Sequence, residues 1–428
     1  MSRTSDHFAD GTEDEQASAG GAGHDPSRTG WAGHRRGTRD FSRLLAAMFF
    51  AGVATFAQLY APQAVLPAIS TGLRVPPAAA ALLVSAATGG LAVSVLLWSW
   101  LADRAGRVRT MLIAIVGATV IGAVVPFTTA LPVMVVLRFL EGACLGGVAG
   151  VAVAYITEET HAASMAAATG LYISGTSLGG LSGRLVSGPI TDLTGSWRAG
   201  VGAVLGLSVV AAVLFAVLVP PARRFIPRRT SLAEVTRRAA GHLRSPRMLA
   251  VFAQAFCLMG AFVTVYNYLG FRLERPPFDL SPTITSLLFL SYLAGTWSSS
   301  RATRAAVHRG RRTVLLGAAG LMLTGLALTW LPSIAVVILG LVVLTAGFFA
   351  GHAIASALAG MMASEGRAQA TALYNFFYYS GSSVMGWAGG YLFTVGGWPA
   401  VSVFCGAAVA AAMLAAWAGL QPDPSRSV

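Results

Sequence analysis

Long apolar stretches separated by short polar segments dominate the chain after residue 41. Each stretch has about 20 residues or more, which is the length that an α-helix needs to cross a bilayer. Backbone polar groups in hydrocarbon must be bonded within their own segment, so these stretches predict helices rather than barrel strands. We therefore expect twelve membrane-spanning helices, at 42–66, 76–101, 108–128, 132–157, 164–190, 198–219, 248–271, 281–300, 312–331, 333–360, 368–394 and 398–419.

The polar segments between these stretches predict the domain organisation. Residues 1–40 are rich in Gly, Ser, Thr, Asp and Glu and contain no apolar run, which predicts a disordered tail. The arginine-rich segment 220–247 separates a six-helix half at 41–219 from a second at 248–419, and residues 420–428 form a short tail. The predicted fold class is an all-α integral membrane protein.

The charge pattern predicts the orientation of the helices. The chain has a net charge of +13 and no lysine. Most arginines lie in one set of alternating loops, and the other set holds Arg74, Arg198, Arg272 and Arg275. This asymmetry places both tails and the 220–247 linker in the cytoplasm, and it explains the basic charge by topology and lipid contact instead of nucleic-acid binding. We expect a multi-pass protein of the plasma (inner) membrane.

The two halves repeat weakly. The segment "ATGLYISGTSLGG" from Ala168 aligns with "ATALYNFFYYSGSS" from Ala370, with Ala, Thr, Leu and Tyr in register. Such halves predict a pseudo-twofold axis along the membrane normal, with a binding site between them.

The loop between the second and third predicted helices reads "SWLADRAGRVR". It resembles the signature loop of the major facilitator superfamily (MFS), except that Ser99 stands where the family has its first glycine. A carboxylate at a helix end, with arginines nearby, can hold one conformation shut. We therefore expect a conformational latch at Asp103, Arg104, Gly106, Arg107 and Arg109. The second copy, "VHRGRRTVL", has Val307 in place of the acid, so the latch should be asymmetric.

Further segments, among them "TEETH", "MGAFVTVYNYLGFRL" and "YLAGTWSS", make residues 41–419 similar to YnfM-type inner-membrane transporters of that superfamily. The resemblance implies a secondary transporter with the twelve-helix MFS fold and a small-molecule substrate. It also implies that the protein acts as a monomer.

Four ionisable residues inside predicted spans are candidates for proton coupling: Arg138, Glu141, Arg184 and His352. Arg138 and Glu141 lie three apart and share a helix face. Arg184 lies at about the same depth, so antiparallel neighbours could bring both arginines to Glu141. The alternatives are that the arginines extend to the membrane surface and that His352 is a bonded core residue.

Polar and aromatic residues within the spans are the candidates for lining a substrate cavity. The two asparagines of the chain lie in the aromatic settings "YNY" and "YNFFYY". Interhelical hydrogen bonding is the alternative role for each. The candidates are Gln58, Tyr60, Tyr266, Asn267, Tyr268, Tyr374, Asn375, Tyr378 and Ser382.

No Walker loop, zinc-ligand spacing or nucleophile–base arrangement is present in the sequence, so we expect neither an enzyme nor a cofactor or bound metal. The predicted function is alternating-access export of a small organic solute in exchange for protons. Proton-coupled uptake is an alternative, and a membrane sensor without transport activity is another.

Overall fold

The structure is a computed structural model that describes residues 33–223, 225 and 232–421. Its long helices are α1 (Arg39–Tyr60), α3 (Pro77–Ala105), α4 (Arg107–Val124), α5 (Leu131–Glu159), α6 (Met165–Thr194), α7 (Trp197–Leu218), α9 (Pro246–Leu273), α11 (Tyr292–Arg309), α12 (Arg311–Leu328), α13 (Ile334–Met361) and α14 (Arg367–Gly419). Shorter helices are α2 (Leu66–Leu73), α8 (Leu232–Leu243) and α10 (Pro282–Leu287), and the 3₁₀ turns are η2 (Gln63–Val65), η3 (Val125–Phe127), η4 (Ala162–Ser164) and η5 (Leu288–Ser291).

The regular elements of the described residues are all helical, as predicted. Nine helices in this part of the chain are long and apolar enough to cross a membrane. One of them, α14, joins two of the predicted spans across Gly397, whose backbone is non-helical (φ 60, ψ −151). Neither α6, which contains Arg184, nor the arginine-bearing α11 is among the nine. The number of spans therefore stays a prediction.

The predicted tails and linker are described in part. Residues 1–32, 224, 226–231 and 422–428 lie outside the described residues. His34 pairs with Thr160 in an isolated bridge, and α1 begins at Arg39 with Thr38 as its N-cap. The linker forms α8, which contacts α9 and α14.

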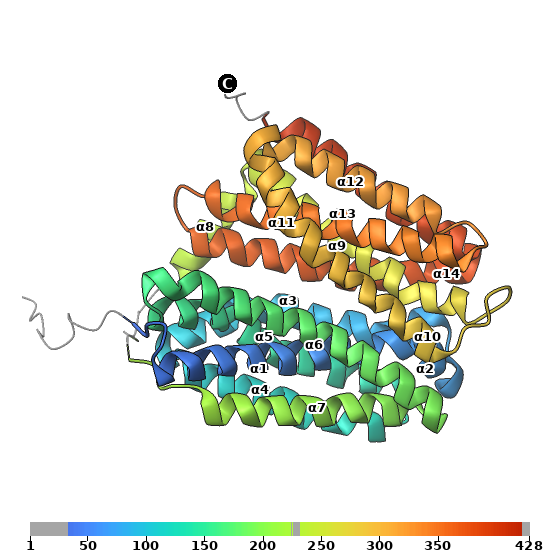
Figure 1. The fold of residues 1–428 in the computed structure, drawn as a ribbon, viewed down its shortest axis with the longest axis horizontal. Coiled ribbons are helices and arrows are strands. Elements are labelled where there is room, and N and C mark those ends of the chain that lie inside the picture. Colours follow the sequence, from blue (N-terminus) through green and yellow to red (C-terminus); the bar gives the residue numbers. More distant parts are fainter. Residues whose placement is uncertain (1–32, 224, 226–231, 422–428) are drawn as a thin grey trace, which may run out of the picture.

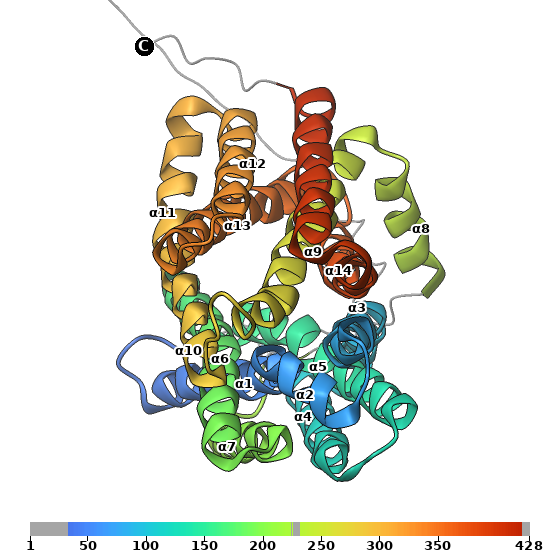
Figure 2. The same ribbon diagram turned by 90° about the vertical axis from the view of Figure 1, so that its right-hand side faces the viewer.

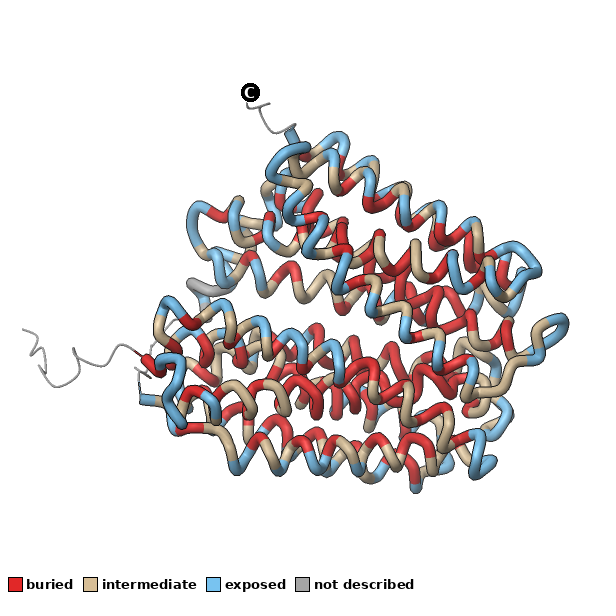
Figure 3. The backbone as a smooth tube through the Cα atoms, viewed as in Figure 1, coloured by how far each residue is buried: buried red, intermediate tan, exposed pale blue. Residues whose placement is uncertain are grey.

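The helices form two groups that lie against each other (Figures 1 and 2). Helices α1–α7 make the N-group, and α9–α14 make the C-group. Figure 1 shows α2 and α10 at one end of the molecule and α8 at the other, which we call the α2 end and the α8 end. Buried residues concentrate inside each group (Figure 3).

Glycines allow helices within the N-group to approach closely. A Cβ added to Gly142 of α5 would lie 1.9 Å from the Ala87 carbonyl oxygen of α3. One added to Gly175 of α6 would lie 2.3 Å from the Phe49 carbonyl oxygen of α1. Small residues at these crossings give the backbone contact that stabilises helix pairs in a membrane.

The first predicted span is interrupted. Helix α1 ends at Tyr60, and Pro62 follows before the 3₁₀ turn η2 and α2. A proline has no N–H, so the carbonyl four residues earlier, that of Gln58, lacks its usual helical donor and accepts over 3.3 Å from the Ala61 N–H instead. The interruption leaves backbone acceptors inside the molecule and places the polar side chain of Gln63 there, where it is 2% exposed.

The two groups are joined near the α2 end. Gln63 of η2 donates to Asn267 of α9 over 2.7 Å, Thr283 of α10 donates to Asp192 of α6 over 2.5 Å, and Ser383 of α14 donates to the Ser85 carbonyl oxygen of α3 over 2.7 Å. Figure 1 shows the groups diverging toward the α8 end.

Candidate functional site

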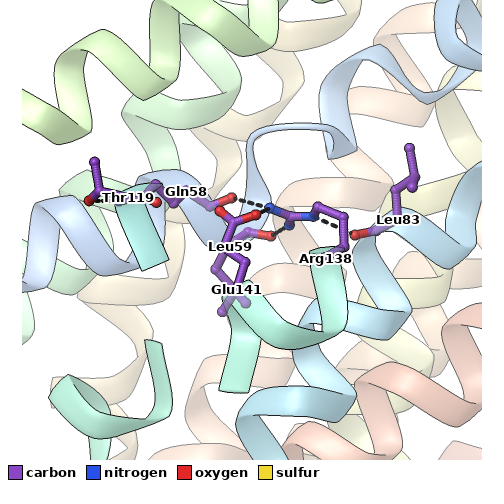
Figure 4. A network of polar contacts seen from close by, with 6 residues as sticks. All are labelled: Gln58, Leu59, Leu83, Thr119, Arg138 and Glu141. Carbon is purple, nitrogen blue, oxygen red and sulfur yellow. Dashed lines mark hydrogen bonds and ion pairs between the residues drawn. The ribbon is translucent and has the colours of Figure 1, made fainter. Parts of the chain in front are cut away.

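Arg138 binds the interrupted end of α1 (Figure 4). The residue is 3% exposed, and its guanidinium donates to the carbonyl oxygens of Gln58 (3.2 Å) and Leu59 (2.6 Å). It also donates to the Leu83 carbonyl oxygen of α3 over 2.8 Å. A cation at a helix C-terminus satisfies carbonyls that have no intrahelical partner. The arginine therefore ties α1, α3 and α5 together inside the N-group.

Glu141 is the counterion of Arg138. Its Oε2 lies 2.8 Å from Nη1 of Arg138, and the side chain is 2% exposed. This is the contact that the spacing of three predicted. The expectation that Arg184 also reaches Glu141 is wrong, because no hydrogen bond or ion pair of the described residues joins the two.

Arg184 lies instead at the junction of the two groups. It is 2% exposed, and its Nε donates to Gln63 Oε1 over 2.7 Å while Nη1 donates to the Gly180 carbonyl oxygen over 2.5 Å. Its guanidinium carbon is 4.3 Å from the ring centre of Tyr60. Neither buried arginine therefore reaches the surface, which removes that alternative.

Gln63 connects the two groups and was missed by the sequence analysis. Its Oε1 accepts from Arg184, and its Nε2 donates to Oδ1 of Asn267. The signal was present: Gln63 is a polar residue between Pro62 and Pro67 in an otherwise apolar span. Prolines inside such a span mark a break whose freed polar groups must be buried in protein or face a cavity.

Several cavity candidates are bonded within the C-group. The Tyr266 hydroxyl lies 2.8 Å from Thr345 Oγ1, and the Tyr268 hydroxyl donates to the Gly386 carbonyl oxygen over 2.6 Å. His352 Nδ1 lies 2.9 Å from the Tyr374 hydroxyl. These contacts match the alternatives of interhelical bonding and of a bonded core histidine.

The remaining candidates are divided between the groups. The Gln58 side chain points to α4, where its Nε2 donates to Thr119 Oγ1 over 3.3 Å. Its amide therefore bonds within the N-group and does not line a common site with Tyr60. Asn375 and Tyr378 are half-buried on α14, and Ser382 is buried on the same helix. The ring of Tyr378 lies 4.7 Å from that of His352.

The candidate latch joins three helix ends of the N-group. Arg107 forms an ion pair with Asp103 (2.6 Å) and donates to both oxygens of Glu158 (2.8 and 3.1 Å). Gly106 has φ +94, which only glycine adopts readily. Arg104 stacks on Trp100 and Arg109 is exposed, so neither bridges the groups.

We expect Arg107→Gln to lower the free energy of unfolding by about 1.5–3 kcal/mol, since hydrogen bonds to charged groups contribute about that much. Arg109→Gln is the matched control, because Arg109 is exposed and makes no ion pair with a described residue. Thermal unfolding in detergent measures both variants. Equal midpoints would show that the ion-pair cluster does not stabilise this end.

Glu274, just beyond α9, is a half-buried carboxyl that the sequence analysis did not single out. It lines a cavity of about 380 Å³ at the α2 end together with Thr71 and Trp197 of the N-group and Arg275 of its own loop. Its Oε1 has no hydrogen-bond partner among the described residues. Burial, and then the nearby charge of Asp192, raise the pKa of Glu274 to about 8.

The closed α2 end should therefore depend on pH. A solvated glutamate has a pKa of about 4.3. The closed arrangement, in which the two groups touch at the α2 end, therefore binds a proton on Glu274 that is released when the groups separate there. The ratio of closed to separated molecules should fall by up to about tenfold per pH unit between roughly pH 5 and 8 and then level off. Spin labels at Leu193→Cys and Asp279→Cys, in a background without other cysteines, measure this. Glu274→Gln should remove this pH dependence. If the variant keeps the wild-type pH profile, Glu274 is not the group responsible.

Comparison with known proteins identifies the family. The family model described as Major Facilitator Superfamily matches residues 48–351. The chain belongs to the Major Facilitator Superfamily. It is 38% identical over 380 residues to the inner membrane transport protein YnfM of Escherichia coli (strain K12), covering 89% of this chain and 91% of that protein. It is 36% identical over 356 residues to the MFS-type transporter YybF of Bacillus subtilis (strain 168), covering 83% and 88%.

Solved structures share the fold at low sequence identity. The D-xylose-proton symporter has a TM-score of 0.70 at 17% identity and covers 91% of this chain and 100% of its own. The nucleoside transporter NupG has a TM-score of 0.66 at 14% identity and covers 90% and 98%. The MFS fold, secondary transport of a solute and a multi-pass location in the plasma membrane are thus confirmed, and the protein is not an enzyme.

Proposed function

We propose that this MFS protein exports a small organic solute in exchange for protons, with both termini in the cytoplasm. The arginine-rich segments support this orientation, because α8 and the arginine-bearing junctions between α3 and α4 and between α11 and α12 lie at the α8 end. Cytoplasmic loops carry the excess of arginine. The contacts between the groups at the α2 end and their divergence toward the α8 end then correspond to a conformation open to the cytoplasm.

The observation that carries the proton coupling is the buried Arg138–Glu141 pair. A carboxylate in the bundle interior with one arginine partner can be ionised while that partner is close, and it takes up a proton when the partner moves. Arg138 also binds the end of α1, so a movement of that segment changes the surroundings of both charges. Protonation and helix movement are linked in this arrangement.

Reconstitution in sealed liposomes with an internal pH dye tests the proposal. Candidate solutes are added to liposomes that contain wild type, Glu141→Gln or Arg109→Gln. Wild type and Arg109→Gln should move protons, whereas Glu141→Gln should not. The sign of the pH change gives the direction of proton movement. The proposal requires proton movement opposite to that of the solute. Movement in the same direction would indicate symport, and binding without flux would indicate the sensor. Flux in Glu141→Gln with an unchanged response to an imposed pH gradient would exclude Glu141 as the coupling residue.

A further inference from the structure

Arg184 is a buried cation without an acidic partner. The ion pairs among the described residues involve Arg107, Arg138 and Arg223, and none includes Arg184. Its hydrogen bonds use Nε and Nη1 and end on neutral oxygens. A buried charge is expensive unless it is paired, so this position lacks one negative charge.

Aromatic rings take the place of a counterion. The guanidinium carbon lies 4.3 Å from the ring centre of Tyr60, 4.8 Å from that of Phe289 and 5.0 Å from that of Tyr292. The negative faces of such rings compensate a cation only in part. Arg138 shows the contrast, since it has a carboxylate and three carbonyl oxygens as acceptors.

The rings come from both groups. Tyr60 belongs to α1, whereas Phe289 and Tyr292 belong to η5 and α11 of the C-group. If the groups separate at the α2 end, Arg184 loses two of its three ring contacts and keeps its bonds to Gln63 and Gly180. The need for an anion is therefore greatest in the conformation open at that end.

An aromatic wall continues from this position into the C-group. The ring of Tyr292 lies 5.3 Å from that of Phe262 and 5.8 Å from that of Phe349, and Phe262 stacks on Phe348 at 3.9 Å. In this conformation the rings pack against one another in the core, Phe262 and Phe348 each being 2% exposed, so they could contact the apolar body of a ligand held by the arginine once the groups separate. A site with one guanidinium and no second cation suits a ligand that carries one negative charge.

We propose that Arg184 binds the carboxylate of the transported solute, so that the substrates are organic monocarboxylates with an apolar or aromatic body. This inference rests on the proposed transport function. Gln63 has a positioning role, because it fixes the guanidinium through Nε and leaves the Nη2 side of the fork for a ligand oxygen.

Thermal stabilisation of the full chain in detergent tests the site without requiring transport. The probes are benzoate, phenylacetate and 3-phenylpropionate, each paired with its carboxamide. A ligand that binds the folded state raises the unfolding midpoint according to its affinity. We expect at least one acid to stabilise wild type while its carboxamide does not, and Arg184→Gln to weaken that acid by about tenfold or more.

Two variants keep the test decisive. Arg184→Lys retains the charge and should bind the acid more weakly than wild type but better than Arg184→Gln. Arg198→Gln, which removes an arginine of the outer loops, should bind as wild type. Equal affinity for acid and carboxamide, unchanged affinity in Arg184→Gln, or no stabilisation by any of the three acids would overturn the inference.

Flux measurements separate this inference from the proposed function. Arg184-dependent binding without liposome flux would retain the carboxylate site and reject transport. Proton-coupled flux of a neutral solute that Arg184→Gln leaves unchanged would retain transport and reject the carboxylate site.

Discussion

Replacing Arg138 by alanine should lower the free energy of unfolding by about 3–5 kcal/mol and abolish coupled transport, because it leaves a buried carboxylate without its partner. Glu141 is 2% exposed, and Arg138 supplies its ion pair at 2.8 Å. The same change removes the donors to the carbonyl oxygens of Gln58, Leu59 and Leu83. Thermal unfolding in detergent and the liposome assay measure the two effects.

The double variant Arg138→Met/Glu141→Leu separates stability from coupling. Replacing a buried ion pair by apolar residues of similar volume is often neutral or stabilising, so this protein should unfold near the wild-type midpoint. It should still lack proton-coupled transport. A double variant as unstable as Arg138→Ala would show that the bonds to the α1 carbonyls, and not the unpaired carboxylate, cause the loss. Wild-type stability of Arg138→Ala itself would contradict the prediction.

Gly188→Ala should shift the protein away from the conformation closed at the α2 end. An added Cβ would lie 2.5 Å from Ser286 Cβ and 2.9 Å from the Pro282 carbonyl oxygen, both in α10 of the opposite group. Overpacking of this kind costs about 1–3 kcal/mol, which corresponds to roughly 5- to 150-fold in the equilibrium between conformations. Distances between spin labels at residues 193 and 279 report the shift.

A second substitution across the interface isolates the contact. Ser286→Gly removes the Cβ and Oγ that the new methyl group meets, so the double variant should recover much of the closed population. Strain between the new methyl group and Pro189 within α6 would not be relieved in this way. Gly202→Ala is the neutral control, since nothing lies within 4 Å of its added Cβ. If the double variant is as open as Gly188→Ala, the α6–α10 contact is not the cause.

The sequence predicted features that depend on one helix and missed those that depend on several. A spacing of three was enough to predict the contact between Arg138 and Glu141. The depth of Arg184 was not enough to predict its partner, because the interruption at Pro62 places Gln63 nearer to it than Glu141. Likewise, "YNY" predicted polar residues inside the bundle, but only the packing of α9 shows that Tyr268 bonds Gly386 whereas Asn267 bonds Gln63.

The interruption of α1 has a thermodynamic consequence. The short stretch from Gln58 to Gln63 accepts hydrogen bonds from Arg138 at its start and from Arg184 at its end. If protonation of Glu141 displaces this stretch, it alters the position of Gln63 and with it the affinity of Arg184 for an anion. Linkage is reciprocal, so anion binding must then change the proton affinity of Glu141 by the same factor. A short break in one helix would thus couple two ligands that never touch.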